Sequence, residues 1–235
     1  MTCKRYERNL ALTAVGPQGQ QAWESARVAV VGAGGLGSPL LYYLAAAGVG
    51  HLAIFDCDVV EETNLNRQIL HAVDRIGESK ATSAARTLLS FNPGISVTAH
   101  AREINTKNCA ELLSGYDLIV DATDNFSTKF LLATYAVEQK RNLVWGTVVG
   151  LHAKLGCYLP NLVAHGGATL LDLYPHVPEA TTDVPAGVLG ASCGVAGSLM
   201  ATMALGALAK TWLPKRKEII LVDTMTATVR PLELK

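Results

Sequence analysis

Closely spaced cysteines are absent from this sequence. The five cysteines, Cys3, Cys57, Cys109, Cys157 and Cys193, are odd in number and far apart along the chain. This spacing matches neither a disulfide framework nor the CxxC pairs that hold structural zinc. Unpaired cysteines are typical of a reducing compartment. We therefore expect a cytoplasmic protein with no structural zinc site.

An excess of charge of one sign is also lacking. Twenty Lys and Arg balance twenty Asp and Glu, which gives no support for general binding to nucleic acid or to acidic membranes. The N-terminal sequence MTCKRYERNL has no apolar core of a secretory signal. The most apolar stretch, residues 193–208, is shorter than a bilayer requires. We expect it to form a buried helix, and we expect neither a membrane nor a nucleic-acid partner.

The sequence does contain enough apolar residues for a core, at 49% of 235 residues. From residue 27 to residue 146, strand-like and helix-like segments alternate, which predicts βαβ units. The fold class expected is α/β, with a Rossmann-like, mostly parallel sheet, antiparallel strands added in the C-terminal part, and helices on both faces. The expected strands are 27–31, 52–55, 95–99, 117–120, 142–145, 154–159, 218–222 and 226–234, and the main helices are 38–48, 80–90, 108–113, 127–139 and 187–210.

A glycine-rich turn follows the first expected strand. Gly32, Gly34 and Gly37 stand in a GxGxxG pattern between strand and helix, where backbone N–H groups attract phosphate. Asp56 ends the second strand, where a carboxylate binds ribose hydroxyls. This pattern predicts a nucleotide site, and an NAD-dependent oxidoreductase would also show it.

The loop after Asp56 separates these two functions. It carries Arg67, and Lys80 begins the next helix. A dehydrogenase would need both cations only for the extra phosphate of NADP, which Asp56 would repel. Two cations fit a triphosphate better, because its leaving pyrophosphate develops charge. The chain has no GxxxxGK[ST] motif, which excludes a P-loop NTPase.

Acidic residues also follow the fourth expected strand, in the sequence DATDN. This segment lies at the carboxyl end of a strand, where open α/β sheets bind ligands. We expect Asp121 to be structural and Asp124 to hold Mg²⁺ beside the phosphates. The alternative is that Asp124 or Asn125 only caps the following helix.

Several motifs together resemble the ThiF/MoeB/HesA family, the bacterial relatives of ubiquitin-activating enzymes. They are RYERN, GAGGLG, DCD, TNLNRQ, DATDN and GVLGASCGVAGSLMA. The resemblance runs almost end to end and implies a single adenylation domain over residues 1–235, in a homodimer that uses ATP and Mg²⁺. It implies an N-terminal helical arm (1–26), a nucleotide-binding half (27–146) and a carrier-binding and dimerisation half (147–235).

The substrate that the resemblance implies is the C-terminal glycine of a ubiquitin-like sulfur-carrier protein with a Gly-Gly tail, in thiamin or molybdopterin biosynthesis. Asp56 would hold ribose, Asp124 would serve Mg²⁺ and the reacting groups, and Arg8 would enter the partner subunit's site as an arginine finger. The catalytic residues implied are Arg8, Arg67, Lys80 and Asp124. The cofactor-binding residues implied are Gly32, Gly34, Gly35, Gly37, Asp56, Asp58, Asn64, Arg67, Gln68, Lys80, Asp124 and Asn125.

The nucleophile of such a reaction is a carboxylate with an ordinary pKa of about 3.5, so it is ionised at neutral pH. No general base is required, and none stands out in the sequence. Catalysis then consists of aligning the carboxylate with the α-phosphorus and neutralising the pyrophosphate.

The sequence departs from the family in three places. Both CxxC pairs of the family's zinc site are missing, Asp183 stands about where many relatives carry a cysteine, and Asn9 replaces a more usual glutamine. We interpret Cys193 as a buried packing residue. His152, His165 and His176 are expected in loops or on the surface.

Three other functions remain open. The first is adenylation of another carboxylate, on a small peptide or on the threonylcarbamoyl group of a tRNA. The second is a role as a catalytically silent partner subunit. The third is oxidation of a substrate with NAD. A silent subunit usually loses residues of the ATP site, whereas Arg67, Lys80 and Asp124 are all present. An oxidoreductase would need a hydride-site His or Lys, and none is found.

Overall fold

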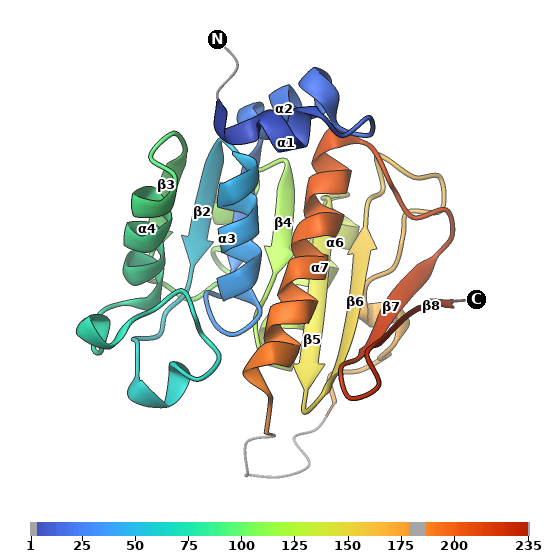
Figure 1. Cartoon of the computed structure of the whole chain (residues 1–235). Coiled ribbons are helices and arrows are strands. Elements are labelled where there is room, and N and C mark those ends of the chain that lie inside the picture. The colour runs from blue at the N-terminus through green and yellow to red at the C-terminus, as the bar shows by residue number, and fades with distance from the viewer. Residues whose placement is uncertain (1–3, 179–186, 235) are drawn as a thin grey trace.

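The computed structural model describes residues 4–178 and 187–234. Within them, eight strands form one sheet in the order β3-β2-β1-β4-β5-β6-β7-β8, and Figure 1 shows helices on both faces. The expected fold class is confirmed. The strands are β1 (Arg27–Val31), β2 (His51–Phe55), β3 (Ser96–His100), β4 (Leu118–Asp121), β5 (Leu143–Val149), β6 (His152–Tyr158), β7 (Glu218–Asp223) and β8 (Thr228–Glu233).

The first five strands run parallel, and the last three extend the sheet in antiparallel fashion. The central strands β1 and β4 are apolar and buried on both faces, as parallel strands covered by helices must be. Since the crossovers place all five strands in one direction, their carboxyl ends meet at a single edge. This edge is at the bottom of Figure 1.

Two separate apolar cores lie on the two faces of the sheet. One is formed with α2 (Gly16–Ser25), α3 (Gly37–Ala47), α4 (Lys80–Phe91) and α7 (Gly190–Ala209), and the other with α5 (Cys109–Leu113) and α6 (Phe126–Glu138). Gly48 ends α3 with a φ of 83°, the left-handed conformation that favours glycine.

The small-residue helix α7 is a core element. By length and composition it is apolar enough to cross a membrane, but half of its most apolar window is buried inside the fold. It packs against α3 and β5. A Cβ on Gly197 would lie 2.5 Å from the Leu36 carbonyl oxygen, so the helices approach at backbone distance. The expectation of a buried helix is confirmed.

The N-terminal segment is helical and docked on its own chain. It contains η1 (Lys4–Tyr6), α1 (Glu7–Leu10) and α2. Trp23 Nε1 donates to the Leu205 carbonyl at 2.9 Å, and Asn92 Nδ2 donates to Tyr6 Oη at 3.0 Å. Figure 1 places these helices at the top, at the edge of the sheet opposite the carboxyl ends of the parallel strands.

Two regions differ from the sequence-based expectation in detail. The fifth strand continues to Val149 because it forms a hairpin with β6. Residues 165–185, for which the sequence predicts a Gly- and Pro-containing loop, contain a 3₁₀ turn, η4 (Leu170–Asp172). The end of this segment, with Asp183, lies outside the described residues. Two further 3₁₀ turns, η2 (Glu62–Asn64) and η3 (Val73–Arg75), shape the connection before α4.

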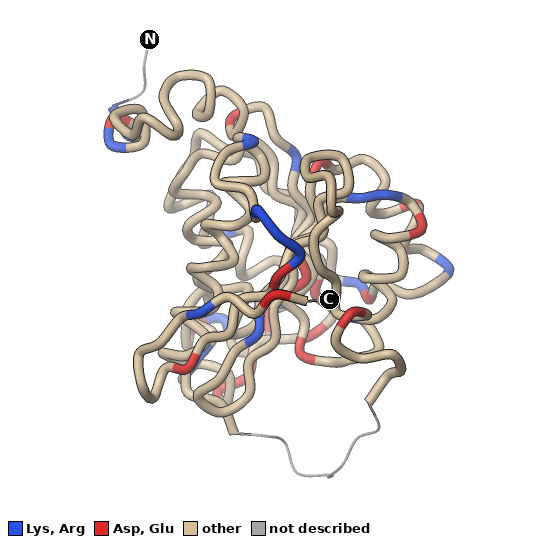
Figure 2. The backbone as a smooth tube through the Cα atoms, turned by 90° about the vertical axis from the view of Figure 1, so that its right-hand side faces the viewer, with Lys and Arg blue, Asp and Glu red and all other residues tan. Residues whose placement is uncertain are grey.

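Figure 2 shows basic and acidic residues interspersed along the backbone.

Candidate active site

A cavity of about 490 Å³ opens at the carboxyl ends of the parallel strands. This is the edge where open α/β sheets bind ligands, and the volume falls in the usual range for small-molecule sites. The walls come from the glycine loop, the connection before α4, the start of α6 and the start of α7. Of the predicted residues, it is lined by Gly32, Gly34, Gly35, Asp56, Asp58, Arg67, Gln68, Lys80, Asp124 and Asn125.

The glycine loop has a geometry that side chains would obstruct. Gly32 has a φ of 99°, and a Cβ there would lie 2.6 Å from the Ala122 carbonyl oxygen. A Cβ on Gly37 would lie 2.1 Å from the Gly32 carbonyl oxygen. Gly37 does not line the cavity, so in the chain alone it serves the packing of helix α3 on the loop.

Asp56 at the end of β2 fixes the loop from one side. Its Oδ2 accepts the Ala33 N–H at 2.8 Å, and its Oδ1 accepts the Asp58 N–H at 2.9 Å. Burial raises the pKa of this carboxyl above its usual value, although the two N–H groups oppose the rise. The carboxylate is therefore held in place at the cavity wall.

Lys80 is buried at the first position of α4. Its Nζ lies 2.8 Å from Asp58 Oδ2, and the exposed fractions of the two side chains are 8% and 64%. The pair thus combines a fixed, desolvated ammonium with a carboxylate that reaches into solvent. An incoming phosphate would compete with Asp58 for the same ammonium.

Arg67 and Gln68 lie in the turn that follows η2. Arg67 Nη1 donates to the Thr63 carbonyl at 2.9 Å and to Asn66 Oδ1 at 3.0 Å. Gln68 is buried, and its Oε1 has no hydrogen-bond partner among the described residues. An unpaired buried amide oxygen at a cavity wall is suited to a ligand donor.

Besides Gly37, two predicted residues do not line the cavity in this single chain. Asn64 is buried, and its Oδ1 accepts the Glu61 N–H at 3.2 Å in a capping box. Arg8 is exposed on α1, at the far edge of the sheet. The fold therefore does not bring Arg8 to the cavity of its own subunit, and a role in a partner's site remains a prediction.

Asp121 at the end of β4 and Asp124 in the segment that follows have different surroundings. Asp121 is buried, and its Oδ1 lies 3.2 Å from Lys129 Nζ, which also donates to the Gly146 carbonyl at 2.6 Å. Asn125 caps α6 by accepting the Thr128 N–H at 2.8 Å. Asp124 is exposed at the cavity and bonds to no described side chain or N–H group. One free carboxylate beside a phosphate site fits Mg²⁺, which usually takes one or two carboxylates plus phosphates.

Cysteine and histidine side chains do not gather into a metal site in the described part of the chain, where no group of three or more His, Cys, Asp and Glu was found. Cys193 is buried and lines the cavity at the start of α7. Burial raises the pKa of its thiol, although Arg67 opposes this. His165 and His152 are exposed, and His165 Nε2 contacts the Pro214 carbonyl, while His176 is also exposed.

Sequence reasoning missed several cavity residues. Arg102, Glu103 and Ile104 line the cavity from the connection after β3, and Lys129 lines it from α6. The rule that ligands meet the carboxyl ends of strands could have found the first three. His71 was also missed. It is buried behind the glycine loop, and no motif rule assigns a role to its position.

Comparison with known proteins identifies the family. The ThiF family model matches residues 6–235. The "probable adenylyltransferase/sulfurtransferase MoeZ" of Mycobacterium tuberculosis is 36% identical over 234 residues, and the match covers 98% of this chain but 60% of MoeZ. The sulfur carrier protein adenylyltransferase of Thermus thermophilus is 38% identical over 235 residues, with 98% and 87% covered. The SAMP-activating enzyme E1 of Haloferax volcanii is 38% identical over 228 residues, with 95% and 82% covered.

A solved structure has the same fold. A crystal structure of E. coli MccB superposes with a TM-score of 0.86 at 23% identity, over 99% of this chain and 72% of that one. At this identity the likeness concerns the fold alone. The chain thus spans three fifths of the MoeZ protein and most of the Thermus and Haloferax relatives. With the family model matching nearly its whole length, the chain belongs to the ThiF family.

Proposed function

We propose that the protein is an ATP-dependent adenylyltransferase. It transfers AMP from ATP to the C-terminal glycine carboxylate of a ubiquitin-like sulfur-carrier protein with a Gly-Gly tail, and pyrophosphate is released. The observation that carries the proposal is one cavity that is lined by the glycine loop, two cations and the exposed carboxylate of Asp124. The names of the Thermus and Haloferax relatives, a sulfur carrier adenylyltransferase and an activating E1, support the choice of substrate.

The role proposed for each cavity residue follows from its charge. The N–H groups around Gly34 and Gly35 face the phosphates, Asp56 accepts the ribose hydroxyls, and Arg67 and Lys80 draw charge from the leaving pyrophosphate. Asp124 would hold Mg²⁺, which neutralises phosphate charge when bound. Lys80 exchanges its Asp58 partner for a phosphate oxygen, so the ion pair keeps the ammonium in place before ATP arrives.

Positioning is the main contribution to catalysis. A carboxylate oxygen of the carrier attacks the α-phosphorus, and the bond from that phosphorus to the pyrophosphate oxygen breaks. The nucleophile is already ionised at neutral pH, with an ordinary pKa of about 3.5. The chain therefore has to align two anions and to screen their repulsion, and it has no proton to remove.

The wider setting follows from the same proposal. We assign residues 27–146 to nucleotide binding and 147–235 to carrier binding and dimerisation, and we place Arg8 in the partner subunit's site. The protein works in the cytoplasm as a homodimer, without nucleic acid, membrane or structural zinc. Purified protein should contain less than stoichiometric zinc by elemental analysis.

The direct test is the intact mass of a candidate carrier after incubation with ATP and Mg²⁺. The proposal expects a carrier that gains one AMP, and a matched carrier lacking its last glycine that gains none. Peptides ending in a carboxylate and tRNA provide the comparison substrates. Adenylation of those substrates and of no carrier would contradict the proposal.

A further inference from the structure

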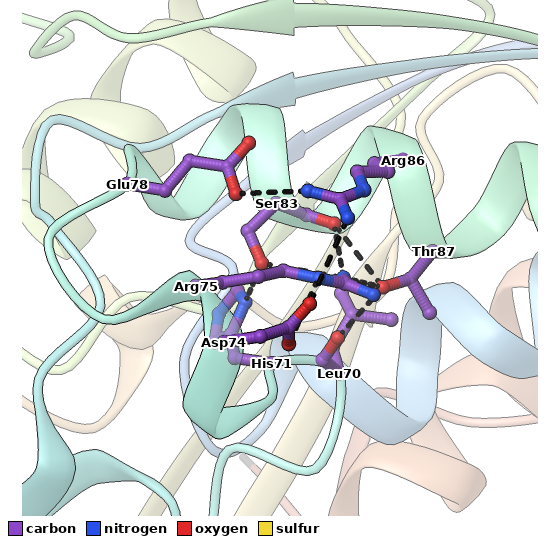
Figure 3. A network of polar contacts seen from close by, with 8 residues as sticks. All are labelled: Leu70, His71, Asp74, Arg75, Glu78, Ser83, Arg86 and Thr87. Atoms are coloured by element: carbon purple, nitrogen blue, oxygen red, sulfur yellow. Dashed lines mark hydrogen bonds and ion pairs between the residues drawn. The ribbon is translucent and has the colours of Figure 1, made fainter.

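One buried histidine joins three walls of the cavity. His71 lies in the connection before α4 and is 7% exposed. Its ring is placed between the glycine loop and α4, and Figure 3 shows it within a network of polar contacts. It does not line the cavity itself, so its contacts act through its neighbours.

The hydrogen bonds define the tautomer of this ring. Nε2 lies 2.9 Å from the Ala33 carbonyl oxygen, and Nδ1 lies 2.9 Å from Ser83 Oγ. Because a carbonyl only accepts, Nε2 must carry the proton and donate. In the neutral ring, Nδ1 then accepts from the Ser83 hydroxyl.

Each contact reaches a different element of the nucleotide site. Ala33 lies in the glycine loop, and its N–H is already held by Asp56, so His71 fixes the other side of the same residue. Ser83 lies one turn beyond Lys80 on α4. The backbone N–H of His71 donates to the Gln68 carbonyl at 3.1 Å, in the turn that also carries Arg67.

A second set of contacts holds the segment around the ring. Arg75 Nη1 donates to the Ser83 carbonyl at 3.0 Å and contacts Thr87 Oγ1. Thr87 Oγ1 donates to the Leu70 carbonyl at 2.9 Å. Figure 3 shows these contacts on the α4 side of His71. The histidine ring is therefore held from both sides and has little freedom to turn.

We propose that neutral His71 is a positioning residue that sets the glycine loop, through its Nε2–H, at a fixed distance from the helix carrying Lys80. This rests on the proposed function only in assuming that ATP binds in the cavity. Without this donor, the Ala33 carbonyl would lack its buried partner and the loop N–H groups would lose their alignment.

The charges around the ring favour the neutral form. Burial lowers the pKa of His71 most, and the nearby cations Lys80 and Arg75 lower it further, while the hydrogen bond to the Ala33 carbonyl and the Asp56 carboxylate oppose them. The folded pKa therefore lies below the unfolded value of about 6.5. Stability is then lost as pH falls through that unfolded value toward the folded pKa.

Two amide variants separate the two ring nitrogens. In His71→Gln the amide N–H reaches the position of Nε2, and in His71→Asn the amide reaches only the position of Nδ1. ATP–Mg²⁺ binding, measured by calorimetry, should stay within about twofold of wild type for His71→Gln and weaken about five- to tenfold for His71→Asn. Equal affinities for the two variants would overturn the proposal, whether both were unchanged or both were weakened.

Urea unfolding between about pH 8 and pH 5 supplies a readout independent of the nucleotide. Wild type should lose stability on the acid side, and His71→Gln should lose less. Parallel curves would overturn the neutral-ring assignment.

Wild type that bound no ATP would overturn this inference together with the proposed function. If ATP binds and the two variants differ as expected, but no carrier is adenylated, the proposed function alone fails.

Discussion

At the scale of single residues, the Lys80 ammonium differs in burial from the carboxylate with which it pairs. It is buried, whereas its partner Asp58 is largely exposed. A buried ammonium is costly unless it is paired, so its position needs a compensating function. The proposed phosphate binding would supply one, because the exposed Asp58 carboxylate could be displaced without moving the lysine.

We predict that Lys80→Ala abolishes most ATP–pyrophosphate exchange while the protein stays folded. Removing a donor aimed at developing charge costs about 2.7–4 kcal/mol of barrier, a loss of about 10²- to 10³-fold in rate. Arg67→Ala should behave in the same way. Exchange rates and far-UV circular dichroism measure the two properties, with the exposed Lys107→Ala as control. Wild-type exchange in Lys80→Ala or Arg67→Ala would remove its phosphate role.

The sequence pattern located cavity residues that stand at strand and helix ends, and it missed residues whose partners are distant in sequence. Asp56 and Lys80 follow directly from the strand end and the helix start, and both line the cavity. The Asn64 side chain accepts the Glu61 N–H within its own turn, and its contact with the nucleotide stays a prediction. His71 gave no signal, since its partners Ala33 and Ser83 are distant in sequence.

At the scale of elements, the approach of α7 to α3 sets the wall that carries Cys193. Gly197 permits the approach, because a Cβ there would meet the Leu36 carbonyl oxygen at 2.5 Å. Gly194 lies one turn earlier on the same helix, with no atom within 4 Å of its added Cβ. Packing against α3 therefore requires glycine at position 197, whereas position 194 has room for a side chain.

We predict opposite effects for alanine at these two positions. Gly197→Ala should lower the free energy of unfolding by about 1–3 kcal/mol, because the backbone of α3 must shift. Gly194→Ala should raise it by up to about 1 kcal/mol through helix propensity. Urea unfolding of both variants measures the difference. Equal changes of the same sign would contradict the close approach of the two helices.

A second element-scale prediction concerns the turn η4 and the residue that precedes strand β7. Asp172 accepts the Thr169 N–H at 2.8 Å and is paired with Lys217. Burial raises the pKa of Asp172, but the hydrogen bonds from Lys217 and Thr169 lower it more, and the net shift is downward. The stability from this group is present above its unfolded pKa of about 3.9 and is lost as pH falls through the folded value.

We therefore predict that Asp172→Asn is less stable than wild type at neutral pH and that the difference shrinks below about pH 4. Thermal unfolding across this range measures it, with the exposed Glu138→Gln as control. If the difference in stability between wild type and Asp172→Asn stayed constant to low pH, the charge of the Asp172 carboxylate would contribute nothing to stability.

The arrangement of elements was largely predictable from the sequence, because buried parallel strands are continuous apolar runs and the glycines mark helix ends. Strand β1 was expected at residues 27–31 and lies there. The extension of β5 to Val149 was not expected, since its last residues become a strand only by pairing with β6. Such pairing depends on contacts with another strand, which the sequence pattern of the segment itself does not predict.

At the scale of the whole molecule, the position of α1 bears on the oligomer. Arg8 is exposed at the edge of the sheet opposite the cavity of its own chain. If Arg8 assists catalysis, it must do so in a second subunit. This requires a two-fold dimer in which each N-terminal segment lies near the partner's cavity.

We predict that mixing two inactive variants restores activity. An Arg8→Ala subunit keeps its nucleotide cavity, and a Lys80→Ala subunit keeps its arginine. With equal mixing and free subunit exchange, about half of the dimers are hybrids with one good site each, so roughly a quarter of wild-type exchange should return. No recovery, with subunit exchange shown by mass spectrometry, would place Arg8 outside the partner's site.

The central claim is that this cavity activates the terminal carboxylate of a carrier protein, and carrier-dependent exchange of labelled pyrophosphate into ATP tests it most directly. Label should enter ATP only when a carrier with its complete Gly-Gly tail is present. A carrier shortened by one glycine should give background exchange, and so should Lys80→Ala with the full tail. Exchange that proceeded equally well without any carrier, or with the shortened tail, would contradict the account.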